Sequence, residues 1–110
     1  MKRPRWWRQF LSRLLPARRL RIVPGDSLPK RLPWRDVVLA READEDWCIG
    51  MRCPCGCGST IELLLIHEAE PRWDVNIDTG GLTTLKPSVW RQTGCRSHFW
   101  LRSGRIEWCE

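Results

Sequence analysis

The chain has 110 residues, of which 42% are hydrophobic, and a formal net charge of +6. A chain of this length fits one domain with a modest core, so a bound metal or disulfides would be a useful supplement to its packing. No apolar run approaches the roughly 18 residues of a spanning helix, and the basic N-terminal segment lacks the unbroken apolar region of a secretory signal. These features predict a cytoplasmic protein without a membrane span.

The positive charge is concentrated at the N-terminal end. Residues 1–35 hold eleven Lys and Arg against one acid, whereas residues 36–110 hold eight against twelve acids. The two parts therefore carry about +10 and −4. The basic character belongs to an arm and not to the part of the chain that contains the cysteines.

The first predicted element is a short amphipathic helix over residues 1–16, because its apolar residues recur at three- and four-residue spacing. Pro16 ends the pattern, and the prolines and glycine that follow predict a basic linker over residues 17–33. We expect the helix to pack on the domain or on a partner protein. Lipid or nucleic acid is the alternative partner. The residues expected to make this contact are Trp6, Trp7, Phe10 and Leu14, with Arg5 and Arg8.

Short β-like runs replace the helical spacing after residue 33. The predicted strands are 36–40, 47–53, 59–66, 72–78, 82–85, 97–102 and 105–109. The run 59–66 is almost continuously apolar, so we expect it to be buried on both faces. Gly80-Gly81 and Ser103-Gly104 each separate two runs and predict hairpins. Residues 34–110 should therefore form one small β-rich, or α+β, domain.

A metal site is predicted from the cysteines. In a reducing compartment, clustered cysteines with a Cys/His pair elsewhere indicate metal binding before disulfides. Zinc takes four thiolate or imidazole ligands in a tetrahedron, and the prolines and glycines of residues 53–58 let that segment bend around an ion. Five candidates compete for four places. They are Cys53, Cys55, Cys57, Cys95 and His98, arranged as in zinc-ribbon hairpins.

The remaining cysteines and the second histidine receive simpler interpretations. Cys48, beside Trp47, is expected to be an ordinary buried residue, whereas Cys109 could replace a ligand if the last hairpin returns to the site. His67 is expected at the surface or as a satisfied core residue. A catalytic interpretation of Cys95 with His98, or of an open zinc site, competes with the structural one. We expect no catalytic residue here, because a filled Cys/His tetrahedron leaves no open coordination position.

Several motifs follow one another in the second half of the chain. They are Cys53-Pro54-Cys55-Gly56-Cys57-Gly58, Leu85-Lys86-Pro87-Ser88-Val89, Cys95-Arg96-Ser97-His98-Phe99 and Gly104-Arg105-Ile106-Glu107-Trp108. With this pattern, roughly C-x-C-G-C-G, L-x-P-S-I, C-x-S-H-[FY] and G-x-I-x-W, the chain resembles an uncharacterised bacterial family of small Cys/His zinc-binding proteins often encoded beside ubiquitin-like conjugation genes. The matching positions include Pro87, Ser88 and Trp108, and Val89 stands where the pattern tends to have Ile.

The resemblance implies a zinc-bearing accessory or ligase-like component of a bacterial ubiquitin-like conjugation system. Its partner would be a ubiquitin-like protein or a homologue of the activating or conjugating enzymes. The first hypothesis is therefore a structural zinc protein that acts as an adaptor by protein–protein docking. Nucleic-acid binding through residues 1–33 is the second. A cysteine- or zinc-dependent enzyme is the third.

Overall fold

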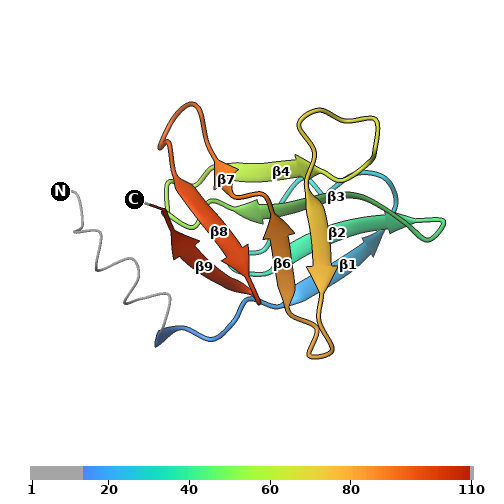
Figure 1. Cartoon of the computed structure of the whole chain (residues 1–110), viewed down its shortest axis with the longest axis horizontal. Coiled ribbons are helices and arrows are strands. Elements are labelled where there is room, and N and C mark those ends of the chain that lie inside the picture. The colour runs from blue at the N-terminus through green and yellow to red at the C-terminus, as the bar shows by residue number, and fades with distance from the viewer. Residues whose placement is uncertain (1–13, 110) are drawn as a thin grey trace.

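The computed structural model describes residues 14–109 and contains nine strands (Figure 1). They are β1 (Leu20–Pro24), β2 (Val37–Glu42), β3 (Glu45–Arg52), β4 (Thr60–Leu64), β5 (Asp74–Ile77), β6 (Thr83–Lys86), β7 (Val89–Trp90), β8 (His98–Arg102) and β9 (Arg105–Trp108). The expectation of a small β-rich domain is confirmed. The helix predicted over residues 1–16 lies almost entirely outside the described residues, and so do its expected contact residues except the exposed Leu14. Within the described part of the chain, no helix has the length and apolar character to span a membrane.

Four strands form one sheet in the order β1-β2-β3-β4. The pairs β2–β3 and β3–β4 are antiparallel, as expected for strands joined by short connections. Strand β1 is parallel to β2, with Leu20 opposite Val37, and it lies within the segment that the sequence predicts as a linker. A five-residue run that ends in a proline carries little strand signal of its own, because its pairing with β2 and the packing of Leu20 on the core are tertiary contacts.

The other five strands form the second layer. The β5–β6 hairpin and the three-stranded β7-β8-β9 sheet lie in front of the first sheet, and their strands cross its strands (Figure 1). The two predicted hairpins are confirmed, with turns at Gly80-Gly81 and Ser103-Gly104. Between the layers lies one apolar cluster that includes Leu39, Ile49, Leu85, Phe99 and Leu101. This core fixes the segments that carry the cysteines and the β7–β8 connection.

Residues 25–34 cover the outer face of the first sheet. A Cβ at Gly50 would lie 2.3 Å from Leu28 Cδ1, so this connection presses directly on β3. Four successive residues of β2, Val37 to Ala40, are buried for the same reason. The expectation that 59–66 is buried on both faces is wrong, because the outer face of β4 is open to solvent. There Glu62 and Leu64 are exposed while Ile61 and Leu63 face the core.

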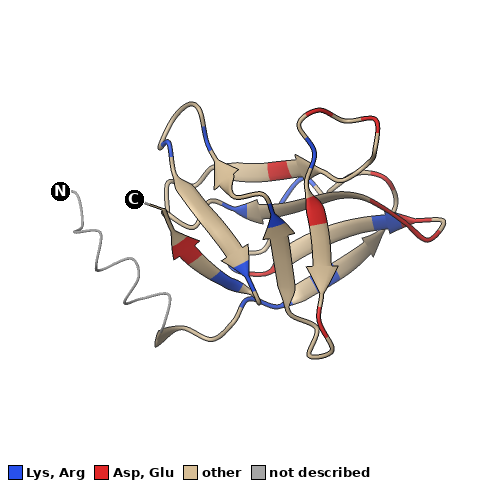
Figure 2. Ribbon diagram, in the orientation of Figure 1, with Lys and Arg blue, Asp and Glu red and all other residues tan. Residues whose placement is uncertain are grey.

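The charges close to β3 differ between its two ends. Acidic residues gather at the β2–β3 turn, and basic residues occur near the opposite end (Figure 2). The cysteine loop, residues 53–58, follows the C-terminal end of β3 and so lies at the basic end. This arrangement places positive charge near the thiols.

Candidate active site and metal centre

The cysteine loop is a tight turn between β3 and β4. Cys53 N–H donates to the Ser59 carbonyl at 2.8 Å, and Gly56 N–H donates to the Cys53 carbonyl at 3.2 Å. Gly56 and Gly58 have φ values of 86° and 87°, a region that residues with a Cβ rarely occupy. The turn therefore reverses the chain within a few residues and directs three cysteine side chains toward one point.

Four thiols converge at this point. The Sγ atoms of Cys53, Cys55, Cys57 and Cys95 all lie within 4.8 Å of one another. Cys53 Sγ is 3.4 Å from Cys55 Sγ and 3.5 Å from Cys95 Sγ. A tetrahedral zinc with Zn–S bonds of about 2.3 Å would separate its sulfurs by about 3.8 Å. The donor set therefore fits a metal that prefers sulfur ligands.

The thiols differ in acidity because their surroundings differ. Burial raises the pKa of Cys55 to about 12. Burial acts in the same direction on Cys95, but hydrogen bonds from Ser97 and from neighbouring thiols outweigh it and lower that pKa to about 6. Hydrogen bonds from Ser59 lower the pKa of Cys57. Four full thiolates at this separation would repel one another strongly, so full ionisation requires a cation at the centre.

Two side chains outside the cluster make hydrogen bonds with its sulfurs: Arg91 donates to them, whereas the Ser97 hydroxyl accepts from Cys53. Arg91 Nη1 lies 3.5 Å from Cys95 Sγ and 3.7 Å from Cys57 Sγ. The buried Ser97 has its hydroxyl 3.2 Å from Cys95 Sγ and 3.7 Å from Cys53 Sγ. A donor such as Arg91 stabilises thiolate charge and orients metal ligands.

The fifth candidate ligand, His98, lies in a different place. Its Nε2 is 2.9 Å from Ser88 Oγ. Ser97 directly precedes β8 and His98 is its first residue, and successive residues of an extended chain point to opposite faces. Ser97 therefore faces the cysteines, whereas His98 faces Ser88. Of the five residues proposed as ligands from the sequence, the structure brings together the four cysteines and places His98 in a serine–histidine pair.

Aromatic residues hold this pair in position. The Trp90 ring stacks on the His98 ring, with centroids 4.7 Å apart and planes 9° from parallel. Trp73 Nε1 donates to the Ser88 carbonyl at 3.4 Å. Among residues 14–109, no carboxylate hydrogen-bonds to the His98 ring. The pair is therefore a dyad whose imidazole is oriented by stacking.

A cleft adjoins the pair on the same face of β8. His98, Trp100 and Arg102 alternate with the buried Phe99 and Leu101, so all three point outward. The cleft has a volume of about 360 Å³ and is lined by Asp74, Thr84, Lys86, Pro87, Trp100 and Arg102. Arg102 lies over the Trp100 ring at 4.4 Å. Pro87, the residue before Ser88, lines the cleft, whereas Ser88 and His98 are not themselves among its lining residues.

The other cysteines and His67 lie elsewhere. Cys48 is buried in the first sheet, which confirms its interpretation as an ordinary buried residue. Cys109 is not a member of the four-thiol group, and its N–H donates to the His98 carbonyl at 2.9 Å. His67 is exposed near Arg72, as expected of a surface histidine.

Sequence reasoning included Ser88 among the positions of a motif but gave it no chemical role. The missing signal was spatial. Ser88 and His98 are ten residues apart and meet only because the two-residue strand β7 pairs with β8, and a strand that short leaves no periodic pattern.

The fold and this pair define a class: small β proteins with a serine and a histidine side chain in hydrogen-bond contact, beside a cysteine cluster. Residues 25–109 match a family model described as "Bacterial ubiquitination-like system serine protease (BubE)". The chain belongs to this family, and the family belongs to a bacterial ubiquitination-like system. No curated protein and no solved structure shows a significant match.

Proposed function

We propose that this chain is a serine peptidase in which Ser88 is the nucleophile and His98 the general base. The observation that carries the proposal is the 2.9 Å contact between Ser88 Oγ and His98 Nε2. Two further facts support it: the residue pair lies beside a cleft, and the matching family is described as a serine protease family. A nucleophile within hydrogen-bond distance of an oriented base is the geometry that acyl transfer requires.

The dyad would work in two halves. A neutral His98 with its proton on Nδ1 accepts the Ser88 hydroxyl proton at Nε2 while Oγ attacks the scissile carbonyl. The histidine then gives that proton to the leaving amine, which leaves the acyl group on Oγ. Water hydrolyses this ester by the same proton transfers in reverse. The stacked Trp90 keeps the imidazole plane fixed during both halves, a task that a carboxylate performs in a triad.

The substrate would be a conjugate of a ubiquitin-like protein, bound along the outer face of β8. The cleft offers an apolar surface at Pro87 and Trp100, and cations at Lys86 and Arg102. An extended peptide would suit this cleft, whose lining residues apart from Pro87 come from β5, β6 and β8. The last residues of a flexible tail are the natural occupants.

The four cysteines would hold one zinc ion in a structural site. Zinc bound there supplies a crosslink between the cysteine loop and the β7–β8 connection, and four thiolates fill its coordination. Through Cys95, this crosslink fixes the connection that ends at His98. The metal would therefore stabilise the dyad's position without contacting substrate.

Labelling with a fluorophosphonate probe tests the proposal directly. We expect the probe to modify Ser88, and we expect Ser88→Ala and His98→Ala to lose the label. Ser27→Ala, which changes an exposed serine in the connection before β2, should label normally. Modification spread over several serines, or retained in Ser88→Ala, would show that Ser88 is not an activated nucleophile.

Docking without catalysis, as an adaptor, is the second candidate. It is favoured by two exposed tryptophans, Trp34 at 77% and Trp90 at 60%, since large exposed aromatics are typical of protein-binding surfaces. Pull-down of a ubiquitin-like protein or of a conjugation enzyme with wild type and with Ser88→Ala separates the candidates. An adaptor captures both equally and cleaves nothing. Nucleic-acid binding stays a prediction that rests on residues 1–33.

A further inference from the structure

A second pocket lies behind the cysteine loop and plays no part in the proposed peptidase. Its volume is about 270 Å³. Three arginines, Arg18, Arg35 and Arg52, line it together with Trp34, Leu15 and residues of the cysteine loop. No acidic residue is among its lining residues.

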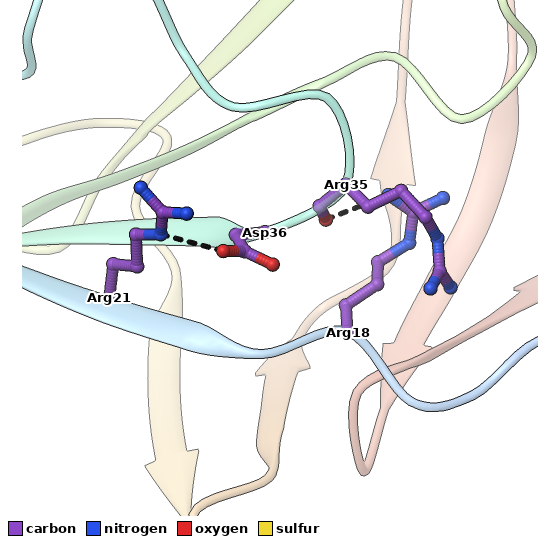
Figure 3. Close-up of polar contacts among 4 residues, drawn as sticks. All are labelled: Arg18, Arg21, Arg35 and Asp36. Carbon is purple, nitrogen blue, oxygen red and sulfur yellow. Dashed lines mark hydrogen bonds and ion pairs between the residues drawn. The ribbon is translucent and has the colours of Figure 1, made fainter.

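Among the described residues, the three arginines donate only to main-chain carbonyls. Arg18 Nη1 donates to the Arg35 carbonyl at 3.0 Å, Arg35 Nη2 donates to the Pro16 carbonyl at 2.7 Å, and Arg52 Nε donates to the Leu32 carbonyl at 3.0 Å. These contacts fix the guanidinium groups but do not neutralise them. Arg21, which follows Arg18 by three residues and lies in β1, is different because its Nε contacts Asp36 Oδ2 at 2.6 Å (Figure 3).

Two of these like charges lie close together. Figure 3 shows the side chains of Arg18 and Arg35 beside each other. Burial and the charge of Arg35 lower the pKa of Arg18 to about 10. Arg35 Nε is buried without a hydrogen-bond partner in the described part of the chain. A buried donor without an acceptor, next to a second cation, is costly until an anion arrives.

The negative charge nearest to the arginines is that of the cysteine loop, where Cys53 acts to raise the pKa of Arg18. Four thiolates around a divalent zinc would carry a net charge of −2, which does not balance three guanidinium groups. Residues 1–13 contain five Lys and Arg and no acid, so the N-terminal arm cannot bring a carboxylate to it. Arginine is suited to carboxylate and phosphate, because its planar fork donates two parallel hydrogen bonds. An oxyanion from outside the chain is therefore the matching ligand.

We infer that this pocket binds a carboxylate-bearing peptide segment of a protein partner. Trp34, at 77% exposure, and Leu15, at 43%, add apolar surface to the rim. A free phosphate would leave that surface bare, whereas an acidic residue followed by an apolar one would cover both the arginines and the rim. The positive charge of the pocket favours the acidic residue of the peptide, and Trp34 favours the apolar residue that follows it.

Calorimetric titration of the full chain tests the inference. The probe is the peptide acetyl-Ala-Glu-Leu-Glu-Ala-amide, and its glutamine counterpart is the control ligand. We expect saturable binding of the glutamate peptide only. Arg35→Gln and Arg52→Gln should each weaken it about tenfold or more. Arg21→Gln removes the same charge from an arginine already paired with Asp36, and it should leave the affinity unchanged.

Since Arg35 also holds the Pro16 carbonyl, thermal melting must show that each variant is folded, and Arg52→Gln supplies an independent measurement. Equal binding of the glutamine peptide, or an equal loss in Arg21→Gln, would overturn the inference. Inorganic phosphate separates the sources of the oxyanion. Displacement of the peptide by millimolar phosphate supports an oxyanion pocket. Phosphate binding tighter than the peptide, unaffected by Trp34→Ala, would overturn the peptide as occupant.

Discussion

The cysteine cluster and the Ser88–His98 dyad share one connection of the chain but differ in the kind of groups they bring together. Cys95 lies within the β7–β8 connection, while Ser88 precedes it and His98 ends it. The cluster gathers four like donors within 4.8 Å, whereas the dyad joins two complementary groups at 2.9 Å. Four like donors require a cation, so residue types reveal such a site in advance. Serine and histidine are common, and only geometry makes them a pair.

The largest effect is expected when the proposed metal is removed from the cysteine cluster. Structural zinc in small domains contributes about 10–16 kcal/mol of apparent binding free energy, as much as the whole stability of a typical domain. We therefore expect a strong chelator, or Cys53→Ser at the most buried ligand, to unfold the chain. Circular dichroism and elemental analysis measure both effects.

Cys109→Ser is the matched control, because Cys109 lies outside the four-thiol group. It should keep about one equivalent of metal and fold normally. A chain that stayed folded and free of metal after chelation would remove the structural role of the cluster.

The next largest effect is expected at Ser88, the proposed nucleophile. Ser88→Ala should lower kcat/KM for a peptide substrate by a factor on the order of 10³ or more, without a change in melting temperature. His98→Ala should cost about as much, and the double variant little more, because the two residues act as a unit. If the two single losses simply multiplied, the dyad would not be one catalytic device.

The acidity of the thiols predicts how metal binding to the cysteine cluster depends on pH. Because burial raises the pKa of Cys55 to about 12, this thiol is protonated at neutral pH and must lose its proton when metal binds. Apparent metal affinity should then fall about tenfold for each unit by which the pH is lowered, from this thiol alone. Cys95, with a pKa lowered to about 6, adds to that slope only below that pH. Chelator competition at pH 6, 7 and 8 measures the slope, and an affinity independent of pH would contradict it.

Trp90 offers a test of how the proposed catalytic pair is held in position. Its ring is 60% exposed, so its removal should hardly affect stability, yet it stacks on His98. We expect Trp90→Ala to lower kcat about tenfold with little change in KM, since a misplaced base slows chemistry more than binding. Trp90→Phe keeps an aromatic face and should restore most of the rate. A raised KM at constant kcat would instead assign Trp90 to substrate contact.

Arg91 should give the smallest effect. It contacts two sulfurs from a partly exposed position, where solvent screens its charge. Arg91→Gln should weaken metal binding less than about tenfold while the fold persists. Chelator competition measures the change, and Arg96→Gln, at an exposed arginine beside Cys95, is the control.

Much of the fold could be predicted from local pattern. Alternating apolar residues and two glycine-containing turns indicated the strands of both hairpins, because those signals are contained in the segments themselves. Strand β1 could not be found in this way, since its partner β2 lies beyond a long connection. The exposed face of β4 was also missed. A run such as Leu63-Leu64-Leu65 does not say which of its faces another segment covers.

The candidate site, too, could be predicted only in part from the sequence. The grouping of cysteines followed from residue type and from the bend of the cysteine loop. The place of His98 did not, because the C-x-x-H spacing suggested a ligand pair, while strand alternation at Ser97 turns the histidine away from the sulfurs. The C-x-x-H rule assumes that all four residues lie in a loop. Here the last of them, His98, is the first residue of β8.

One backbone contact bears on how the protein is made. Arg18 N–H donates to the Gly104 carbonyl at 2.7 Å, and a Cβ at Gly104 would lie 2.9 Å from the Arg18 carbonyl, so these distant segments fit closely. On the ribosome, residue 18 must wait for residue 104 before this seam can close, and three thiols emerge well before the fourth. Until residue 104 has been made, the nascent chain therefore carries unshielded cysteines and an open core.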